Sequence, residues 1–226
     1  MIPYYLDEYK TTIWWSAKCG CTTIKNVIHN IIYKRDVKMI HCSDHSFQRN
    51  KLNYTNILIV RNPINRLIAC YLDKYELWQK MFFNNKDYSF LEFVTKLQKE
   101  FPSTMYEHHF ARQFEESFEG IELQFFRERG HRFKFDFVYS LESLKFTEFL
   151  QKHFQIKCDS VPFLAITKKN ERYLVDKAYE VSKPNLPNAN NEFPNYKCFL
   201  NESIIQIIKD LYLKDYEYMK QYAITY

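Results

Sequence analysis

The chain has 226 residues, which fits one domain able to bury roughly 70% of the surface that its unfolded form would expose. Hydrophobic residues make up 46% and charged residues 26%, a composition that excludes a disordered chain. The net charge is +5 and the basic residues are dispersed, so a small anionic ligand is favoured over general nucleic-acid binding. We therefore expect a single globular domain, residues 1–226, that does not bind nucleic acid.

The cysteines and the N-terminus indicate the compartment. Six cysteines are too scattered for a disulfide scaffold, and Cys19 and Cys21 are one residue closer than the common C-x-x-C pair. We expect structural thiols, no metal and a reducing, cytoplasmic location. The first residues lack a charged start followed by an apolar run, and no apolar stretch reaches about 18 residues, so neither a signal peptide nor a membrane span is expected.

The first motif follows an expected strand, Thr11–Trp15, and reads Lys18-Cys19-Gly20-Cys21-Thr22-Thr23. Thr22 is a suitable N-cap for a helix through about Tyr33. Free backbone N–H groups at a helix start, beside a lysine and hydroxyls, form an anion cradle. The motif has one glycine and lacks Gly-Lys-Ser/Thr, which argues against a kinase or an ATPase.

The second motif is Arg61-Asn62-Pro63-Ile64-Asn65-Arg66, which follows an expected strand over 56–60. That strand is continuously apolar, as is typical of a parallel strand covered on both faces. Pro63 suits the first turn of a helix that runs past Tyr75. Two strand–turn–helix units predict an α/β fold with a mostly parallel central sheet, flanked by helices, and a site at the carboxyl ends of the strands.

The remaining elements follow in chain order, after a short strand expected over 37–40. Ser89 and Glu92 have the spacing of a capping box and predict a helix through about Lys99. A third core strand is expected over 135–139 and a helix over 144–153. The segment 182–196, rich in proline and asparagine, is expected to be a loop whose length favours a functional lid. The last predicted helix runs from Asn201 to about Tyr222.

The Lys18 motif followed by the Arg61 motif resembles the two cofactor motifs of sulfotransferases that use 3′-phosphoadenosine 5′-phosphosulfate (PAPS). The closest likeness is to the carbohydrate sulfotransferases. Further segments are similar to that family and extend the resemblance to Tyr216: His109-Phe110-Ala111-Arg112-Gln113, Phe135-Asp136-Phe137-Val138 with Glu142, and Leu211-Tyr212-Leu213-Lys214-Asp215-Tyr216. The resemblance implies a P-loop-like sulfotransferase fold. It also implies an enzyme that transfers a sulfuryl group from PAPS to an acceptor hydroxyl, and it favours a carbohydrate or glycan as the acceptor.

The resemblance also implies roles for particular residues. Lys18 would reach the bridging oxygen of PAPS, and the Gly20–Thr23 backbone would cradle the 5′-phosphate. Arg61 would grip the 3′-phosphate with its planar fork. Where the family has a serine eight residues after this arginine, the chain has Ala69, which removes one donor. The full set of expected cofactor-binding residues is Lys18, Cys19, Gly20, Cys21, Thr22, Thr23, Arg61 and Ala69.

The acceptor hydroxyl needs a base, and histidine is the natural choice near neutral pH. His109 lies in a segment similar to the family's His-Trp-x-x-Gln, and His45 lies where related uronyl 2-O-sulfotransferases place a histidine. Both remain candidates, with His108, His41 and Glu107 behind them.

Two other functions remain open from the sequence. A protein that binds PAPS or its product 3′-phosphoadenosine 5′-phosphate (PAP) without turnover is suggested by Ala69 and by the undecided base. A nucleotide kinase-like phosphotransferase shares the strand–loop–helix layout, but no clear magnesium aspartate follows the second strand.

Overall fold

The computed structural model describes residues 2–20, 24, 53–104, 109–113, 135–155, 174–188 and 192–226. The chain divides into two compact units. The sheet unit comprises Met1–Arg61, Arg112–Pro162 and Lys214–Tyr226, and the helical unit comprises Asn62–Ala111 and Phe163–Leu213. That the whole chain acts as one domain remains a prediction.

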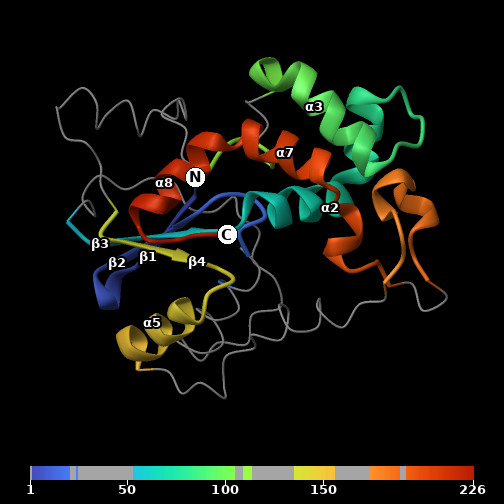
Figure 1. The fold of residues 1–226 in the computed structure, drawn as a ribbon. Helices are drawn as coiled ribbons and strands as arrows, with labels where there is room; N and C mark the ends of the chain where they lie inside the picture. Colours follow the sequence, from blue (N-terminus) through green and yellow to red (C-terminus); the bar gives the residue numbers. More distant parts are fainter. Residues whose placement is uncertain are drawn as a thin grey trace. The chain divides into compact units, whose positions relative to one another are not determined.

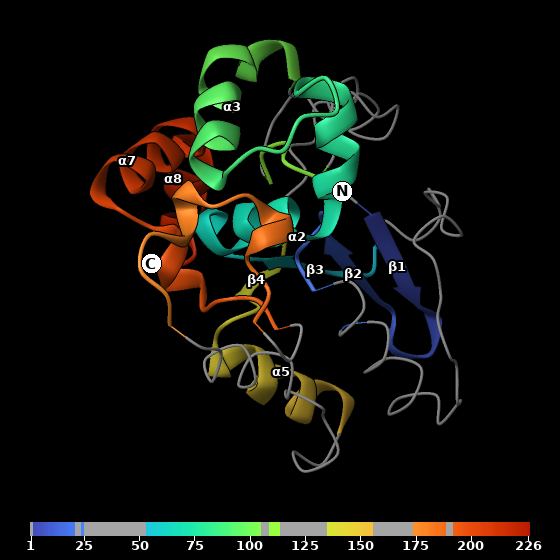
Figure 2. The ribbon, with the colours of Figure 1, turned by 90° about the vertical axis from the view of Figure 1, so that its right-hand side faces the viewer.

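The sheet unit contains a four-stranded sheet in the order β1-β2-β3-β4. Its strands are β1 (Ile2–Leu6), β2 (Thr11–Trp15), β3 (Thr55–Val60) and β4 (Phe137–Ser140). Strands β2, β3 and β4 are parallel, and β1 is an antiparallel edge strand beside β2 (Figure 2). The predicted α/β class with a mostly parallel sheet is confirmed, while β1 was not predicted.

Both faces of this sheet are covered, which explains the unbroken apolar sequence of β3. On one face, α8 (Leu213–Gln221) brings Met219 into a cluster with Trp14, Leu58 and Val138. On the other face, α5 (Leu144–Phe154) stacks Phe149 on Tyr139 with ring centroids 4.8 Å apart. Figure 1 shows the two helices on opposite sides of the strands.

The helical unit is built from α2 (Pro63–Phe82), α3 (Phe90–Thr104) and α7 (Glu202–Leu211), with short 3-10 helices at Ala178–Glu180, Lys183–Asn185 and Tyr196–Phe199. The predicted capping box is confirmed, because the Ser89 amide donates to Glu92 Oε2 at 2.7 Å and the Glu92 amide donates to Ser89 Oγ at 3.2 Å. Helix α2 begins at Pro63, as predicted, with the Asn62 carboxamide accepting from the Ile64 amide at 2.9 Å.

Aromatic side chains form the core of the helical unit. The Tyr88 hydroxyl donates to the Tyr75 carbonyl at 2.9 Å, and the Tyr71 hydroxyl donates to the Tyr88 carbonyl at 3.1 Å. Burial raises the pKa of Tyr71 and of Tyr88, so both phenols stay neutral donors. Much of the heavy aromatic content is therefore packing. Among the described residues of this unit, the fully buried rings are Tyr71, Tyr75, Trp78, Tyr88, Phe90, Phe93, Phe110, Phe199 and Tyr212.

Two predictions need correction. The last helix was predicted to be continuous but ends at Leu211, because Tyr212 adopts φ −109° and ψ 23° and its hydroxyl donates to the Phe110 carbonyl. The segment 182–196, predicted as a loop, contains the Lys183–Asn185 3-10 helix and the start of another. The helix expected over 22–33, except Ile24, and the strand over 37–40 lie outside the described residues.

Candidate functional site

The first motif forms a tight turn at the carboxyl end of β2. Lys18 and Gly20 both have positive φ, 66° and 79°. The Cys19 amide donates to the Ser16 carbonyl at 3.1 Å, and the Ile24 amide donates to the Gly20 carbonyl at 2.9 Å, as in the first turn of a helix. A Cβ on Gly20 would lie 2.6 Å from a methyl carbon of Leu141, so the turn requires glycine at this position.

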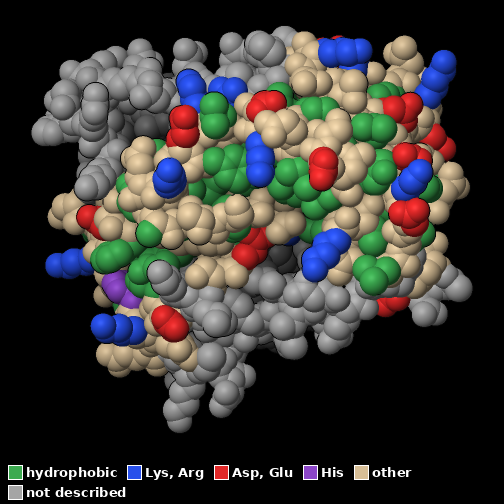
Figure 3. Space-filling view, viewed as in Figure 1, with side chains coloured by type: hydrophobic (Ala, Val, Ile, Leu, Met, Phe, Trp, Pro, Cys, Tyr) green, Lys and Arg blue, Asp and Glu red, His purple; other side chains and the backbone are tan. Residues whose placement is uncertain are grey.

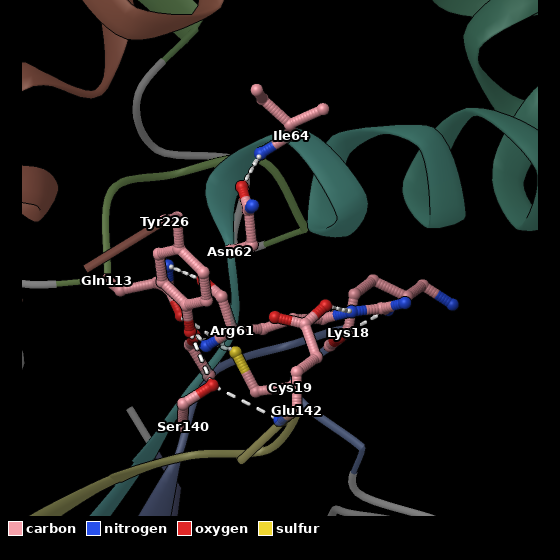
Figure 4. Close-up of polar contacts among 10 residues, drawn as sticks. Lys18, Cys19, Arg61, Asn62, Ile64, Gln113, Ser140, Glu142 and Tyr226 are labelled. Atoms are coloured by element: carbon pink, nitrogen blue, oxygen red, sulfur yellow. Dashed lines mark hydrogen bonds and ion pairs between the residues drawn. The ribbon is translucent and has the colours of Figure 1, made fainter. Parts of the chain in front are cut away.

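Arg61 follows β3 directly and connects the two motifs. Its Nη1 donates to the Lys18 carbonyl at 3.1 Å, and its Nε lies 3.5 Å from Glu142 Oε1. Only 9% of the Arg61 side chain is exposed. In Figure 4 the Arg61 and Lys18 side chains extend in the same direction, away from Gln113. The two cations expected to hold the cofactor therefore share one edge of the sheet.

Gln113 is the buried centre of this edge. Its Oε1 accepts from the Arg61 amide at 2.9 Å and from the Cys19 thiol at 3.0 Å. Its Nε2 donates to the Arg61 carbonyl at 2.9 Å. The Asp215 carboxylate is fully buried, and its two oxygens accept from the backbone N–H of Gln113 at 2.8 and 2.9 Å. One side chain thus joins both motifs, and α8 holds it in place.

The carboxyl end of β4 completes the edge. Ser140 Oγ accepts from the Glu142 amide at 3.1 Å and from the Tyr226 hydroxyl at 2.6 Å. Although Tyr226 is 45% exposed, its hydroxyl reaches the buried Ser140, and burial raises the pKa of Tyr226. The phenol therefore remains a neutral donor beside Glu142.

The charges of this edge suit a phosphate-bearing ligand. Glu142 offsets part of the Arg61 charge and fixes the guanidinium, while Lys18 is only partly buried and adds a second cation. On the face drawn in Figure 3, Lys and Arg side chains are interspersed with Asp and Glu. In the ranges that the structure describes, no group of three His, Cys, Asp or Glu is placed to hold a metal.

The other predicted residues divide among the sheet unit, the helical unit and the ranges that the structure does not describe. Cys19 is fully buried, and its thiol faces Gln113 rather than solvent. Ala69 lies half-buried on α2, and His109 lies half-buried with its ring 5.9 Å from that of Trp78; both belong to the helical unit. Several predicted residues lie outside the described ranges: Cys21, Thr22, Thr23, His45, His41, His108 and Glu107.

Sequence reasoning assigned no role to Gln113, Asp215 or Glu142, although all three lie in segments that resemble the family. One signal was present for Asp215, which follows Leu211 and Tyr212 by about one helical turn and places a carboxylate beside apolar positions. A buried carboxylate requires donors, which predicts a polar partner.

The fold and this edge define an α/β protein in which a turn that contains a lysine and a glycine follows a parallel strand, the place where α/β proteins commonly bind anionic ligands. The chain matches the model of the "Sulfotransferase family" over residues 16–222, so it belongs to the sulfotransferase family and is a sulfotransferase. No curated protein matches the chain, and no solved structure does. No helix in the described part of the chain is long and apolar enough to cross a membrane.

Proposed function

We propose that the protein transfers a sulfuryl group from PAPS to an acceptor hydroxyl. The observation that carries this proposal is the position of Lys18 and Arg61 at one edge of the parallel strands, joined by the hydrogen bond from Arg61 Nη1 to the Lys18 carbonyl. PAPS presents anionic groups at its 5′ and 3′ positions, and two neighbouring cations from two different motifs match this need.

Lys18 is the residue proposed to stabilise charge on the leaving oxygen. It lies three residues after the end of β2, on a turn whose backbone is fixed by hydrogen bonds on both sides of Gly20. A cation held in this way lowers the barrier by electrostatic stabilisation, because it is oriented before the reaction begins. When bound, PAPS supplies the activated sulfuryl group, and in the transfer the acceptor oxygen bonds to sulfur as the bond to the phosphate oxygen breaks.

Arg61 is the residue proposed to bind the 3′-phosphate. Its Nη1 and Nε already contact Lys18 and Glu142, so its fork would hold the phosphate with its remaining N–H groups. Ala69 supplies no hydroxyl to share this load. We therefore expect weaker PAP binding here than in a variant with serine at that position.

The acceptor proton is proposed to pass to a histidine, His109 or His45. The variants His109→Ala and His45→Ala separate the two, because a base acts on the acceptor and its loss leaves PAP affinity nearly unchanged. The essential variant loses transfer and also the acidic limb of the activity–pH curve. If both retain transfer, a carboxylate such as Glu107 becomes the first candidate. For the acceptor, we propose a carbohydrate, as in the relatives that the motifs most resemble.

A second function, PAP binding without turnover, is favoured by one observation, the missing hydroxyl at Ala69. Calorimetry with PAP, and with ATP and magnesium, followed by a PAPS-dependent screen over glycan and small-molecule acceptors, separates the two. Metal-independent PAP binding with transfer of labelled sulfate supports the proposal, and PAP binding with no transfer to any acceptor supports the second function. Binding of ATP with magnesium in place of PAP contradicts both.

A further inference from the structure

Strand β2 leaves the sheet before β3 ends. Its ladder with β3 ends at the pair Trp15 and Ile59, and in that register Ala17 would lie opposite Arg61. Instead the chain turns away into the Lys18 turn, with the Cys19 amide bonded to the Ser16 carbonyl. Strand β3 thus loses its neighbour one residue before the cofactor motif begins.

The backbone of Arg61 faces the gap that β2 leaves. On the other side, the Val60 carbonyl accepts from the Leu141 amide at 2.7 Å, so Val60 faces β4 and the next residue, Arg61, faces the β2 side. A buried N–H and C=O left there without partners would destabilise the folded chain, because they would lose their hydrogen bonds to water and gain none in return. The carboxamide of Gln113 fills the gap, since it accepts from the Arg61 amide and donates to the Arg61 carbonyl, both at 2.9 Å.

The same carboxamide also holds the departing chain. Gln113 Oε1 accepts from the Cys19 thiol at 3.0 Å, one residue after Lys18. The side-chain oxygen of Gln113 must accept, because Oε1 faces two donors. The side-chain nitrogen must donate, because Nε2 faces two acceptors, the Arg61 carbonyl and, at 3.5 Å, Asp215 Oδ2. A carboxylate of the same shape could accept the hydrogen bonds that Oε1 accepts, but it could not donate as Nε2 does.

We infer that Gln113 is a positioning residue: its amide replaces the missing strand at Arg61 and holds the Lys18 turn against it, so that the two cations keep one spacing. Asp215 acts through Gln113 by binding its backbone N–H. The inference rests on the proposed function for its effect on cofactor binding, and on the hydrogen bonds alone for its effect on Arg61.

The test uses the near-isosteric variant Gln113→Glu in the full chain, with PAP as the probe. Near about pH 8 we expect PAP affinity to fall about tenfold or more relative to wild type, because the new carboxylate cannot donate to Arg61 and repels Asp215. Near about pH 6 the difference should narrow, since two close carboxylates share a proton and the protonated group donates again. Other charged or titratable groups that face the carboxamide are the Cys19 thiol and Arg61, itself paired with Glu142.

A charge-swapped variant separates positioning from bulk packing. In Gln113→Glu with Asp215→Asn, the new carboxamide can donate to the new carboxylate and accept from the N–H of residue 113, which removes the repulsion between two carboxylates. The Arg61 carbonyl still lacks its donor, so affinity at about pH 8 should recover only in part and stay below that of wild type. Gln206→Glu is the matched control, because Gln206 donates to Asp210 at 2.7 Å on the exposed surface of α7 and its variant should bind PAP as wild type does. Wild-type affinity at about pH 8, in Gln113→Glu or in the double variant, would overturn the inference, because neither protein has a donor for the Arg61 carbonyl.

Hydrogen exchange tests the contact between the Gln113 side chain and the Arg61 backbone without the cofactor. In Gln113→Ala we expect the Arg61 amide to exchange about tenfold faster or more, while the Leu58 amide inside the ladder keeps its protection relative to global stability. Unchanged exchange of the Arg61 amide would show that Gln113 does not hold the Arg61 backbone, even if the protein binds PAP. If wild type shows no PAP binding but Arg61 loses protection in the variant, the proposed function fails and the positioning role of Gln113 stands.

Discussion

Gly20→Ala is the most direct test of the Lys18 turn, because the structure gives both parts of its cost. Gly20 has φ +79°, a region that costs an L-residue roughly 1–2 kcal/mol. The new methyl would also lie 2.6 and 2.7 Å from the two methyl carbons of Leu141, and overpacking of this kind costs about 1–3 kcal/mol. We expect the free energy of unfolding to fall by about 2–5 kcal/mol in total.

The two parts can be separated with Leu141→Ala, which removes the side chain that the new methyl meets. Alone, Leu141→Ala should cost about 2–5 kcal/mol through the cavity that it leaves. In the double variant the methyl of Gly20→Ala partly fills this space, so the combined loss should be smaller than the sum of the single losses by about 1–3 kcal/mol. Urea unfolding of the four proteins at one pH measures this coupling.

The result that refutes the reasoning is additivity. If the double variant loses the sum of the single losses within about 0.5 kcal/mol, the two side chains do not meet and the turn is not packed as described. A Gly20→Ala variant as stable as wild type would in addition show that residue 20 does not adopt a positive φ.

Single substitutions at Lys18, Ala69 and His153 test three further features of the molecule. Lys18→Ala should keep the wild-type unfolding midpoint but lower turnover about a hundredfold or more, and turnover within a few-fold would remove Lys18 from the mechanism. Ala69→Ser should strengthen PAP binding by up to about fivefold in calorimetry, whereas unchanged affinity would place the 3′-phosphate elsewhere. His153, which contacts Thr11 Oγ1 at 3.0 Å, has its pKa lowered by burial, so the unfolded chain takes up a proton below about pH 6.5 that the folded chain resists. Stability should therefore fall as the pH drops through that value, and a His153→Gln variant whose urea midpoint has the same pH dependence as wild type would contradict this assignment.

The local sequence was sufficient to predict the elements whose signals are local. The unbroken apolar run before Arg61 predicted a parallel strand, Pro63 predicted the start of α2, and Ser89 with Glu92 predicted the start of α3; the structure confirms each. Backbone angles and caps depend on a few neighbouring residues, so one sequence determines them. The turn at Lys18 was predicted for the same reason, although the positive φ of Lys18 itself was not.

The hydrogen bonds of Gln113 at the candidate site could not be predicted, because they join residues that are distant in sequence. Gln113 contacts Arg61, 52 positions away, and Asp215, 102 positions away. Nothing near Gln113 in the sequence indicates that its amide replaces a strand. The edge strand β1 was missed because its two tyrosines and proline give no clear alternation, and its pairing with β2 is what defines it.

The break between α7 and α8 shows how one local deviation serves the site. A continuous helix through 201–222 would be the simplest outcome of its apolar pattern, yet the Tyr212 hydroxyl bonds to the Phe110 carbonyl and the helix ends. Three residues later, Asp215 accepts from the Gln113 amide, which is itself three residues after Phe110. The two chain segments are therefore joined twice, by Tyr212 with Phe110 and by Asp215 with Gln113. Because a new helix begins at Leu213, the position of Asp215 is not set by the helix that carries Tyr212, and its carboxylate reaches Gln113, which contacts both Arg61 and Cys19.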